Sequence, residues 1–142
     1  MAILTDGHST TVVISTFAST GIYCVVSVTP PSKSGGEKND LTCMENVKYR
    51  TSAPKKLVTS GNISLRVNWD PVIYNTIDDV INQLGTVTIN FSDGSNIQEI
   101  GSVQDWEPDE IVEGTDPEGT LVVAIHNRNA AGAEVGTVYN AA

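Results

Sequence analysis

The stretch from Gly61 to Phe91 most constrains the fold, because the spacing of its apolar residues changes twice. Residues 62–69 read N-I-S-L-R-V-N-W, with an apolar side chain at every second position. This period of two predicts a strand with one buried face and one wet face. Residues 86–91 alternate in the same way and predict a second strand.

Between these two strands the apolar spacing becomes helical. Asp70 and Pro71 form a favourable helix start, because Asp caps free N–H groups and Pro suits the first helical position. The apolar residues that follow lie on one helical stripe: Ile73, Ile77, Val80, Ile81 and Leu84. Gly85 is a fitting C-terminal stop. We therefore expect one helix over residues 71–84, covering an edge or end of a β fold.

The rest of the chain is rich in strand and turn residues and shows no second helical period. Further strands are predicted over residues 10–17, 22–29, 96–106 and 120–127, with a hairpin turn at Asp93-Gly94. The strand over 120–127 is apolar on both faces, which indicates cover by the core or by a neighbouring copy. We predict a mainly β fold: a β-sandwich with one flanking α-helix and a long projecting loop. Its 142 residues suit a single domain, 1–142.

Three segments lie outside this pattern. Residues 1–9 read as an N-terminal arm and residues 137–142 as a C-terminal tail. Residues 30–56 form a long irregular segment, and such a segment in a compact domain is usually functional or disordered. We expect a projecting loop or hairpin here, with a mobile surface loop as an equal alternative. The segment holds six of the eight basic residues: Lys33, Lys38, Lys48, Arg50, Lys55 and Lys56.

Charge is distributed unevenly along the chain. The net charge is −9, which argues against tight binding of nucleic-acid phosphates, yet residues 1–66 carry +3 and residues 67–142 carry −12. One acidic stretch stands out as a candidate surface for a partner, and it is also the candidate lumen surface under the family resemblance given below: Asp105, Glu107, Asp109, Glu110, Glu113, Asp116 and Glu118. Such asymmetry suits surfaces that meet between copies of one protein. A solvated acidic surface is the simpler explanation.

The sequence holds no motif for catalysis or cofactor binding. There is no G-x-S-x-G elbow and no phosphate-binding glycine loop, and His8 and His126 stand alone. The acids of 105–118 leave a glycosidase-like carboxylate pair open. The alternation of Asp105, Glu107 and Asp109 matches a calcium loop only weakly, because no glycine follows at the required place. We expect a protein that is not an enzyme and that needs no cofactor and no metal.

The two cysteines and the first residues point to a reducing compartment. Cys24 lies in an apolar run and is predicted to be a small core residue, whereas a disulfide with Cys43 has no supporting pattern. The chain starts without a basic and apolar leader, and no apolar run is long enough for a membrane span. We expect a soluble protein that is made in the cytoplasm and contacts no membrane.

An ordered set of phrases resembles the major tail tube proteins of long non-contractile phage tails and related gene transfer agents. The phrases are S-V-T-P-P-S-K-S-G-G from Ser27, D-L-T-C-M-E-N from Asp40, Y-R-T-S-A-P-K-K-L from Tyr49, G-N-I-S-L-R-V-N-W-D-P-V-I-Y from Gly61, F-S-D-G-S, W-E-P-D-E-I-V-E-G, and N-R-N-A-A-G-A-E-V from Asn127. The second is similar to the family's Asp-x-Thr-x-Met-x-Asn. Together they span residues 22 to 135, although the comparison says little about the Lys-rich loop or Cys43.

This resemblance implies a structural virion protein. Its subunits would form hexameric rings whose inner strands join into a β-barrel, and the rings would stack into a tube that conducts genome DNA without binding it tightly. It implies assembly in the host bacterial cytoplasm with a tape-measure protein, a tail terminator and baseplate or tail-tip proteins. The basic residues of 30–56 would then stack one ring on the acidic surface of the next.

Two other functions remain open from the sequence. A tail terminator or a baseplate-proximal ring protein would share the fold, so the fold cannot separate them from a tube subunit. A β-sandwich module for carbohydrate binding or adhesion is the alternative from another class. Such modules usually show clustered exposed aromatic residues or a calcium site, and this sequence shows neither pattern clearly.

Overall fold

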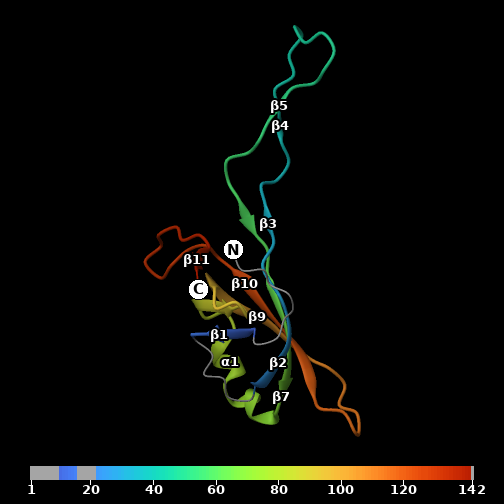
Figure 1. The fold of residues 1–142 in the computed structure, drawn as a ribbon, viewed down its shortest axis with the longest axis vertical. Helices are drawn as coiled ribbons and strands as arrows, with labels where there is room; N and C mark the ends of the chain where they lie inside the picture. The colour runs from blue at the N-terminus through green and yellow to red at the C-terminus, as the bar shows by residue number, and fades with distance from the viewer. Residues whose placement is uncertain (1–9, 16–21, 142) are drawn as a thin grey trace.

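The structure, a computed structural model, describes residues 10–15 and 22–141, and of residues 22–24 only the backbone. The predicted N-terminal arm, 1–9, lies outside the described residues, as does the side chain of Cys24. Figure 1 shows a curled β body from which one long hairpin projects far beyond the other elements. The body holds the core, and the projection and the loops extend from its two ends.

The body is a seven-stranded antiparallel sheet. Its strands are β1 (Thr11–Ile14), β2 (Ile22–Thr29), β7 (Ile63–Trp69), β8 (Gly85–Asn90), β9 (Asn96–Pro108), β10 (Glu118–Ile125) and β11 (Val138–Asn140). The order is β1-β8-β9-β10-β7-β2, with β11 paired to β9. The prediction of a mainly β fold is confirmed, and each predicted strand has a counterpart within a few residues.

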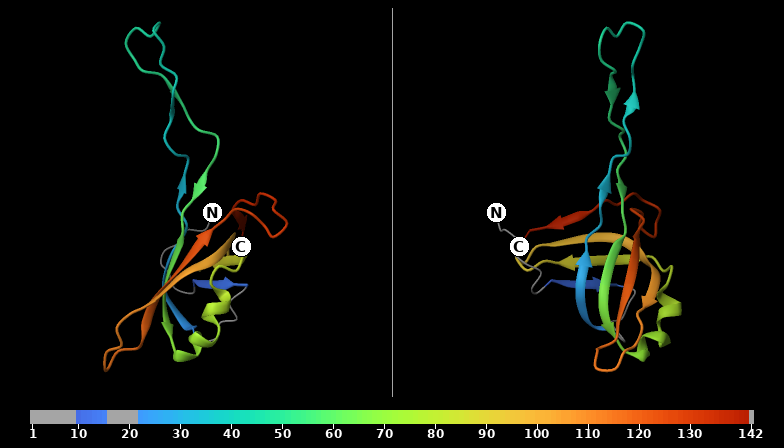
Figure 2. Two further views of the ribbon diagram at one scale, coloured as in Figure 1. Left: turned by 180° about the vertical axis from the view of Figure 1, so that it is seen from behind. Right: turned by 90° about the vertical axis from the view of Figure 1, so that its right-hand side faces the viewer.

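The long strand β9 curls this sheet into two facing halves. Its first half pairs with β8 on one side and β11 on the other, so that Gln98 lies opposite both Thr88 and Val138. Its second half pairs with β10, where the register shifts between Val122 and Val123. Such a bulge bends a strand and increases its twist. Figure 2 shows the resulting curl, in which one sheet supplies both layers of a sandwich-like body.

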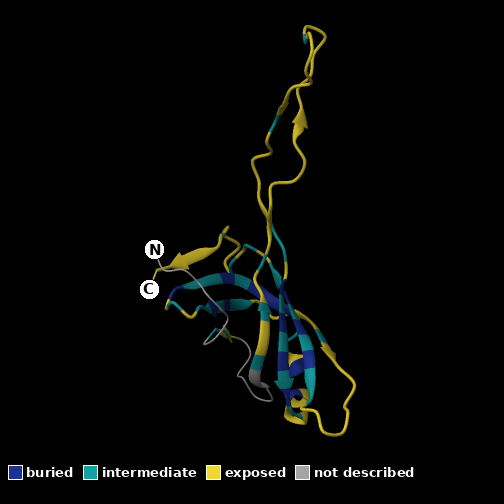
Figure 3. Cartoon of the chain, turned by 45° about the vertical axis from the view of Figure 1, so that its right-hand side comes forward, coloured by how far each residue is buried: buried dark blue, intermediate teal, exposed yellow. Residues whose placement is uncertain are grey.

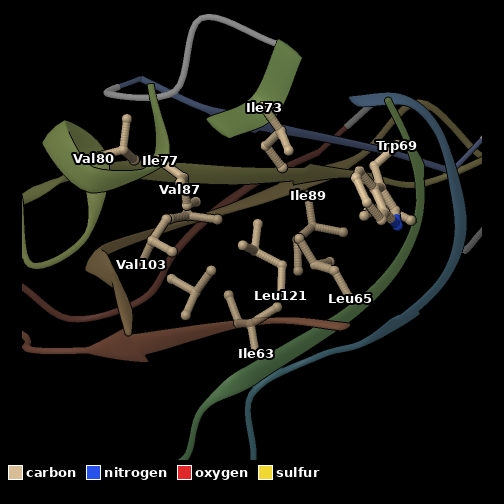
Figure 4. Close-up of a cluster of buried hydrophobic side chains, with 12 residues drawn as sticks. Ile63, Leu65, Trp69, Ile73, Ile77, Val80, Val87, Ile89, Val103 and Leu121 are labelled. Atoms are coloured by element: carbon tan, nitrogen blue, oxygen red, sulfur yellow. The ribbon is translucent and has the colours of Figure 1, made fainter. Parts of the chain in front are cut away.

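The core fills the space inside the curl. Figure 4 shows its side chains converging from both layers. The buried apolar residues of the strands are Ile63, Leu65, Val67 and Trp69 of β7, Val87 and Ile89 of β8, Val103 of β9, and Leu121 and Val123 of β10. The burial pattern of β7 alternates along its whole length, as the period of two predicts. Each fully buried aliphatic side chain stabilises the fold by roughly 1.5–3 kcal/mol.

The helical segment is shorter than predicted. It consists of a 3₁₀ helix, η1 (Pro71–Asn75), and one turn of α-helix, α1 (Ile77–Val80). The start is as predicted, because the Asp70 side chain accepts a hydrogen bond from the backbone N–H of Val72. Ile73, Ile77 and Val80 are buried against the open side of the curl.

The prediction of one continuous helix over residues 71–84 is wrong in its extent. The backbone leaves the helix at Asn82, which has a positive φ of 67° and donates its N–H to the Val103 carbonyl at 2.9 Å. Pairing with β9 therefore replaces the next helical turn. Leu84 remains 37% exposed, and Gly85 begins strand β8 instead of ending a helix.

The C-terminal segment is also more ordered than predicted. Residues 137–142 were expected to form a tail, but Val138–Asn140 is a strand that completes the first half of β9. The predicted hairpin turn between β8 and β9 is confirmed, with Gly94 at a φ of 91°. Asp93 accepts hydrogen bonds from the hydroxyl and the backbone N–H of Ser95, and these bonds lower the pKa of its carboxyl.

Candidate functional site: the arm and the acidic hairpin

The projecting hairpin, residues 30–60, is named the arm. Two short ladders hold it: β3 (Lys33–Ser34) pairs with β6 (Thr59–Ser60), and β4 (Asn39–Asp40) pairs with β5 (Ser52–Ala53). Figure 3 shows that the arm is exposed almost throughout. The predicted projecting loop is therefore a long hairpin, in which no residue is buried.

The tip of the arm is organised by one asparagine. The Asn46 amide donates to the Tyr49 carbonyl at 2.7 Å, and its backbone N–H donates to the Cys43 carbonyl at 3.1 Å. This turn leaves the Met44 and Val47 side chains completely exposed, and Tyr49 largely so. Cys43 is an exposed free thiol. Several large apolar side chains on one projection are typical of a surface that another molecule covers.

The six basic residues predicted as a stacking site all lie on the arm. Lys38, Lys55 and Lys56 are exposed and form no ion pair within the described chain. Lys48 lies over the Tyr49 ring, 5.4 Å from its centroid. Arg50 is 3.5 Å from Asp40, but both side chains are exposed, and such pairs stabilise little. These five cations are thus available to a partner.

Lys33 differs, because it points into the root of the arm. Its ammonium donates to the Ser60 hydroxyl at 2.8 Å and to Thr137, and lies 3.3 Å from the Glu99 carboxylate. Glu99 is only 1% exposed, and Thr137 donates a further hydrogen bond to it. This network fastens the arm to β9 and to the segment before β11. Sequence reasoning did not identify Glu99, because a lone acid in an alternating strand normally faces water.

The acidic residues predicted as a partner or lumen surface lie together on the β9–β10 hairpin. This acidic hairpin, residues 105–118, carries seven acids and no base. Five of the acids are exposed and form no ion pair within the described chain: Asp105, Glu107, Glu110, Glu113 and Asp116. At its tip, Ile111 and Val112 are also exposed, at 68% and 51%.

The other two acids have a partner within the chain. The Arg66 guanidinium on β7 hydrogen-bonds Asp109 and, at 2.9 Å, Glu118. These hydrogen bonds raise the pKa of Arg66. The pairing holds the two legs of the acidic hairpin against β7, so its base is fixed while its tip remains free.

The arm and the acidic hairpin extend from opposite ends of the body (Figures 1 and 2). The structure therefore brings the basic residues together and the acidic residues together, but it keeps the two groups apart. They can meet only between copies. A contact of this kind is heterologous, and repeated contacts build rings, columns or filaments.

The structure also places a serine beside His126, which stands alone in the sequence. The Ser102 hydroxyl lies 2.8 Å from His126 Nε2, beside a hollow of about 330 Å³ that Asn82 and Arg128 also line. A hydrolytic triad needs a third group that orients the base. Within the described chain, no carboxylate is bonded to the other ring nitrogen of His126. Residues 24 positions apart leave no local signal, so only the fold reveals the pair.

Among residues 10–15 and 22–141, no three His, Cys, Asp or Glu side chains gather in a way that could hold a metal ion. No helix in the described ranges is long and apolar enough to cross a membrane.

A curled β body carries a basic arm at one end and an acidic hairpin at the other, so the two ends of the molecule carry opposite charge. No protein-family model and no curated protein sequence matches the chain. Among solved structures, it matches a chain in the six-fold symmetrised cryo-EM structure of the anti-feeding prophage baseplate. The TM-score is 0.63 at 9% identity, covering 99% of this chain and 98% of that one. The two chains therefore share a fold over nearly their whole lengths.

Proposed function

We propose that this chain is a structural subunit of a phage tail or a phage-tail-like particle, and specifically a major tail tube subunit that stacks in rings. The observation that carries the proposal is the placement of the basic arm and the acidic hairpin at opposite ends of one body. Both projections also expose apolar side chains at their tips. The shared fold with a baseplate chain of a six-fold particle supports the same class.

Ring closure would use the edges of the sheet. β1 and β2 stand at the two ends of the described strand order. An open edge strand offers backbone N–H and C=O groups to another chain, and closing a ring of subunits removes that liability. Six copies joined edge to edge would give a continuous barrel. The six-fold symmetry of the baseplate that contains the matched chain supports this number.

The tube would act as a conduit without catalysis. A net charge of −9 per subunit gives an acidic assembly, and DNA carries about one negative charge per 1.7 Å of axis. Repulsion between the two would keep DNA from adhering while it slides. The partners of such a tube are a tape-measure protein, a tail terminator and baseplate or tail-tip proteins. The protein would reside in the virion after assembly in the bacterial cytoplasm.

A baseplate-proximal ring protein is the second candidate, and one observation favours it. The matched chain belongs to a baseplate structure, and it aligns with this chain end to end. The number of copies per particle separates the two functions. A tube subunit is present in many rings, whereas a baseplate-proximal protein forms one ring or a few. Quantitative mass spectrometry of purified particles would give this number.

Assembly of the purified protein tests the proposal. We expect negative-stain electron microscopy at high concentration to show rings or hollow tubes, and the mass in solution to rise with concentration. A variant that lacks the arm tip is the matched control, because it removes the exposed apolar side chains of the tip together with Lys48 and Arg50. A monomer at every concentration, including in the presence of sheared particles as seeds, would contradict the proposal.

A further inference from the structure

A groove at the root of the arm has the properties of a docking site for the acidic hairpin. We propose that the tip of the acidic hairpin of one copy, residues 110–113, inserts into the arm-root groove of the next copy. This inference deepens the proposed function, because it assigns the surface through which stacked rings would meet. It names a second copy of this chain as the occupant.

The groove lies between the arm and the C-terminal segment. A hollow of about 320 Å³ is lined on the arm side by Lys56, Leu57 and Val58, and on the other side by residues 134–137. A second hollow of about 570 Å³ shares Lys56 and Leu57 and continues along the arm. Leu57 and Val58 are 82% and 62% exposed. The groove therefore offers apolar side chains that nothing in the described chain covers.

The tip of the acidic hairpin is complementary to this groove in composition. It presents Ile111 and Val112 between Glu110 and Glu113, and the backbone turns back at Gly114, which has a φ of 81°. These two aliphatic side chains match the exposed Leu57 and Val58. Their burial would remove apolar area from water at both surfaces, which is the main driving force for association.

Charge fixes the direction of the contact. Lys55 and Lys56 flank the groove and make no ion pair within the described chain, whereas Lys33 is already paired with Glu99. Glu134 also lines the groove, so the two free lysines must outweigh one acid. The two lysines outnumber Glu134, so the groove presents a net positive charge to Glu110 and Glu113 of the incoming hairpin. An arm-to-arm contact or a hairpin-to-hairpin contact would instead place like charges together, which is unfavourable.

The positions of the groove and of the acidic hairpin also favour a contact between two copies. The groove is lined by the root of the arm and by the segment before β11. The arm and the acidic hairpin extend from opposite ends of the body (Figure 2). A copy cannot fill its own groove. Each copy can fill the groove of one neighbour and receive the hairpin of another, and this heterologous arrangement propagates along an axis.

A cysteine pair tests the contact directly. In a Cys24→Ala, Cys43→Ser background, Ile111→Cys on the hairpin tip and Val58→Cys in the groove are both substitutions at exposed positions. Under mild oxidation the double variant should give a ladder of covalent multimers on a non-reducing gel, because each copy carries both halves of the contact. Each single variant should give dimers at most. Pairing Ile111→Cys with Val72→Cys, which is exposed but outside the groove, is the matched control.

The outcomes separate this inference from the proposed function. Tubes in the microscope with no ladder would overturn the hairpin contact and leave the function standing. A ladder without rings or tubes would support the contact and count against a ring-forming function. Only dimers from the double variant would mean a two-fold contact, which overturns the inference.

Charge reversal provides a second test without cysteines. Lys56→Glu and Glu113→Lys should each raise the concentration needed for assembly about tenfold, which corresponds to about 1.4 kcal/mol. The double variant restores opposite charges and should return to within about threefold of the original concentration on the same scale. Asp79→Lys, an exposed reversal on α1, is the control. A double variant that assembles no better than either single variant would overturn the inference.

Discussion

At the scale of single residues, Lys33 and Glu99 connect the arm to the body. The Glu99 carboxylate is buried, and it accepts hydrogen bonds from Lys33 and Thr137. A second carboxylate oxygen of Glu99 has no hydrogen-bond partner in the described chain. Removing one member of a buried charged pair is costly because the other charge stays out of water.

We predict that Lys33→Met lowers the free energy of unfolding by about 2 kcal/mol. This value lies below that for a fully buried pair, because the Lys33 side chain is 41% exposed. Urea denaturation monitored by tryptophan fluorescence would measure it. Lys55→Met, at an exposed lysine of the same arm, should change the stability by less than about 0.5 kcal/mol. Equal effects of the two substitutions would mean that the Glu99 pair does not stabilise the fold.

At the scale of elements, the outer part of the arm can be removed without disturbing the body. Asn39 and Ala53 are register partners across the arm, so residues 40–52 can be replaced by Asn-Gly, a favoured two-residue turn. We predict that this truncated subunit stays folded, with a circular-dichroism melting temperature within a few degrees of the original, and forms no tubes. Long tubes from the truncated subunit would show that the arm tip is not a stacking element.

The elements that the sequence predicted well are those with a strong local period. The strand over residues 63–69 alternates without a break, and the Asp93-Gly94 turn has a local hydrogen-bonding reason. The helix was overestimated because Ile81 and Leu84 continue the helical spacing, while the backbone at Asn82 pairs with Val103, which is distant in sequence. The strand at 138–140 was missed for the same reason, since three residues acquire their pairing only from β9.

The candidate site was predictable in composition but not in geometry. Turn formers and lysines indicated a projecting segment, and seven acids indicated a charged surface. Nothing local places these two groups at opposite ends of the body. Lys33 pairs with Glu99, which lies 66 positions further along the chain, and Arg66 pairs with Asp109, which lies 43 positions further along. Pairings over such distances in sequence depend on the folded sheet.

At the scale of the whole molecule, the opposite charges of the two ends would make the proposed stacking of subunits sensitive to salt. The Debye length falls from about 8 Å at 0.15 M to about 3 Å at 1 M ionic strength, which screens exposed pairs strongly. We predict that tubes formed at about 1 M salt are shorter than those formed at about 0.15 M. Length distributions from electron microscopy would measure this, with sucrose of matched osmolality as the control. Unchanged lengths would mean that apolar burial at the tips dominates the contact.

The thinness of the arm has a kinetic consequence. Each of its ladders pairs only two residues per strand with nearly nothing buried, which is less than an isolated hairpin needs to be stable in water. Ordering such a segment costs roughly 1–2 kcal/mol per residue in backbone entropy, so the first encounter between two free subunits is unfavourable. In the proposed assembly, a subunit that joins a growing end whose arms are already ordered would meet a smaller barrier. Growth would therefore start from a template, and the template would decide where a polymer begins.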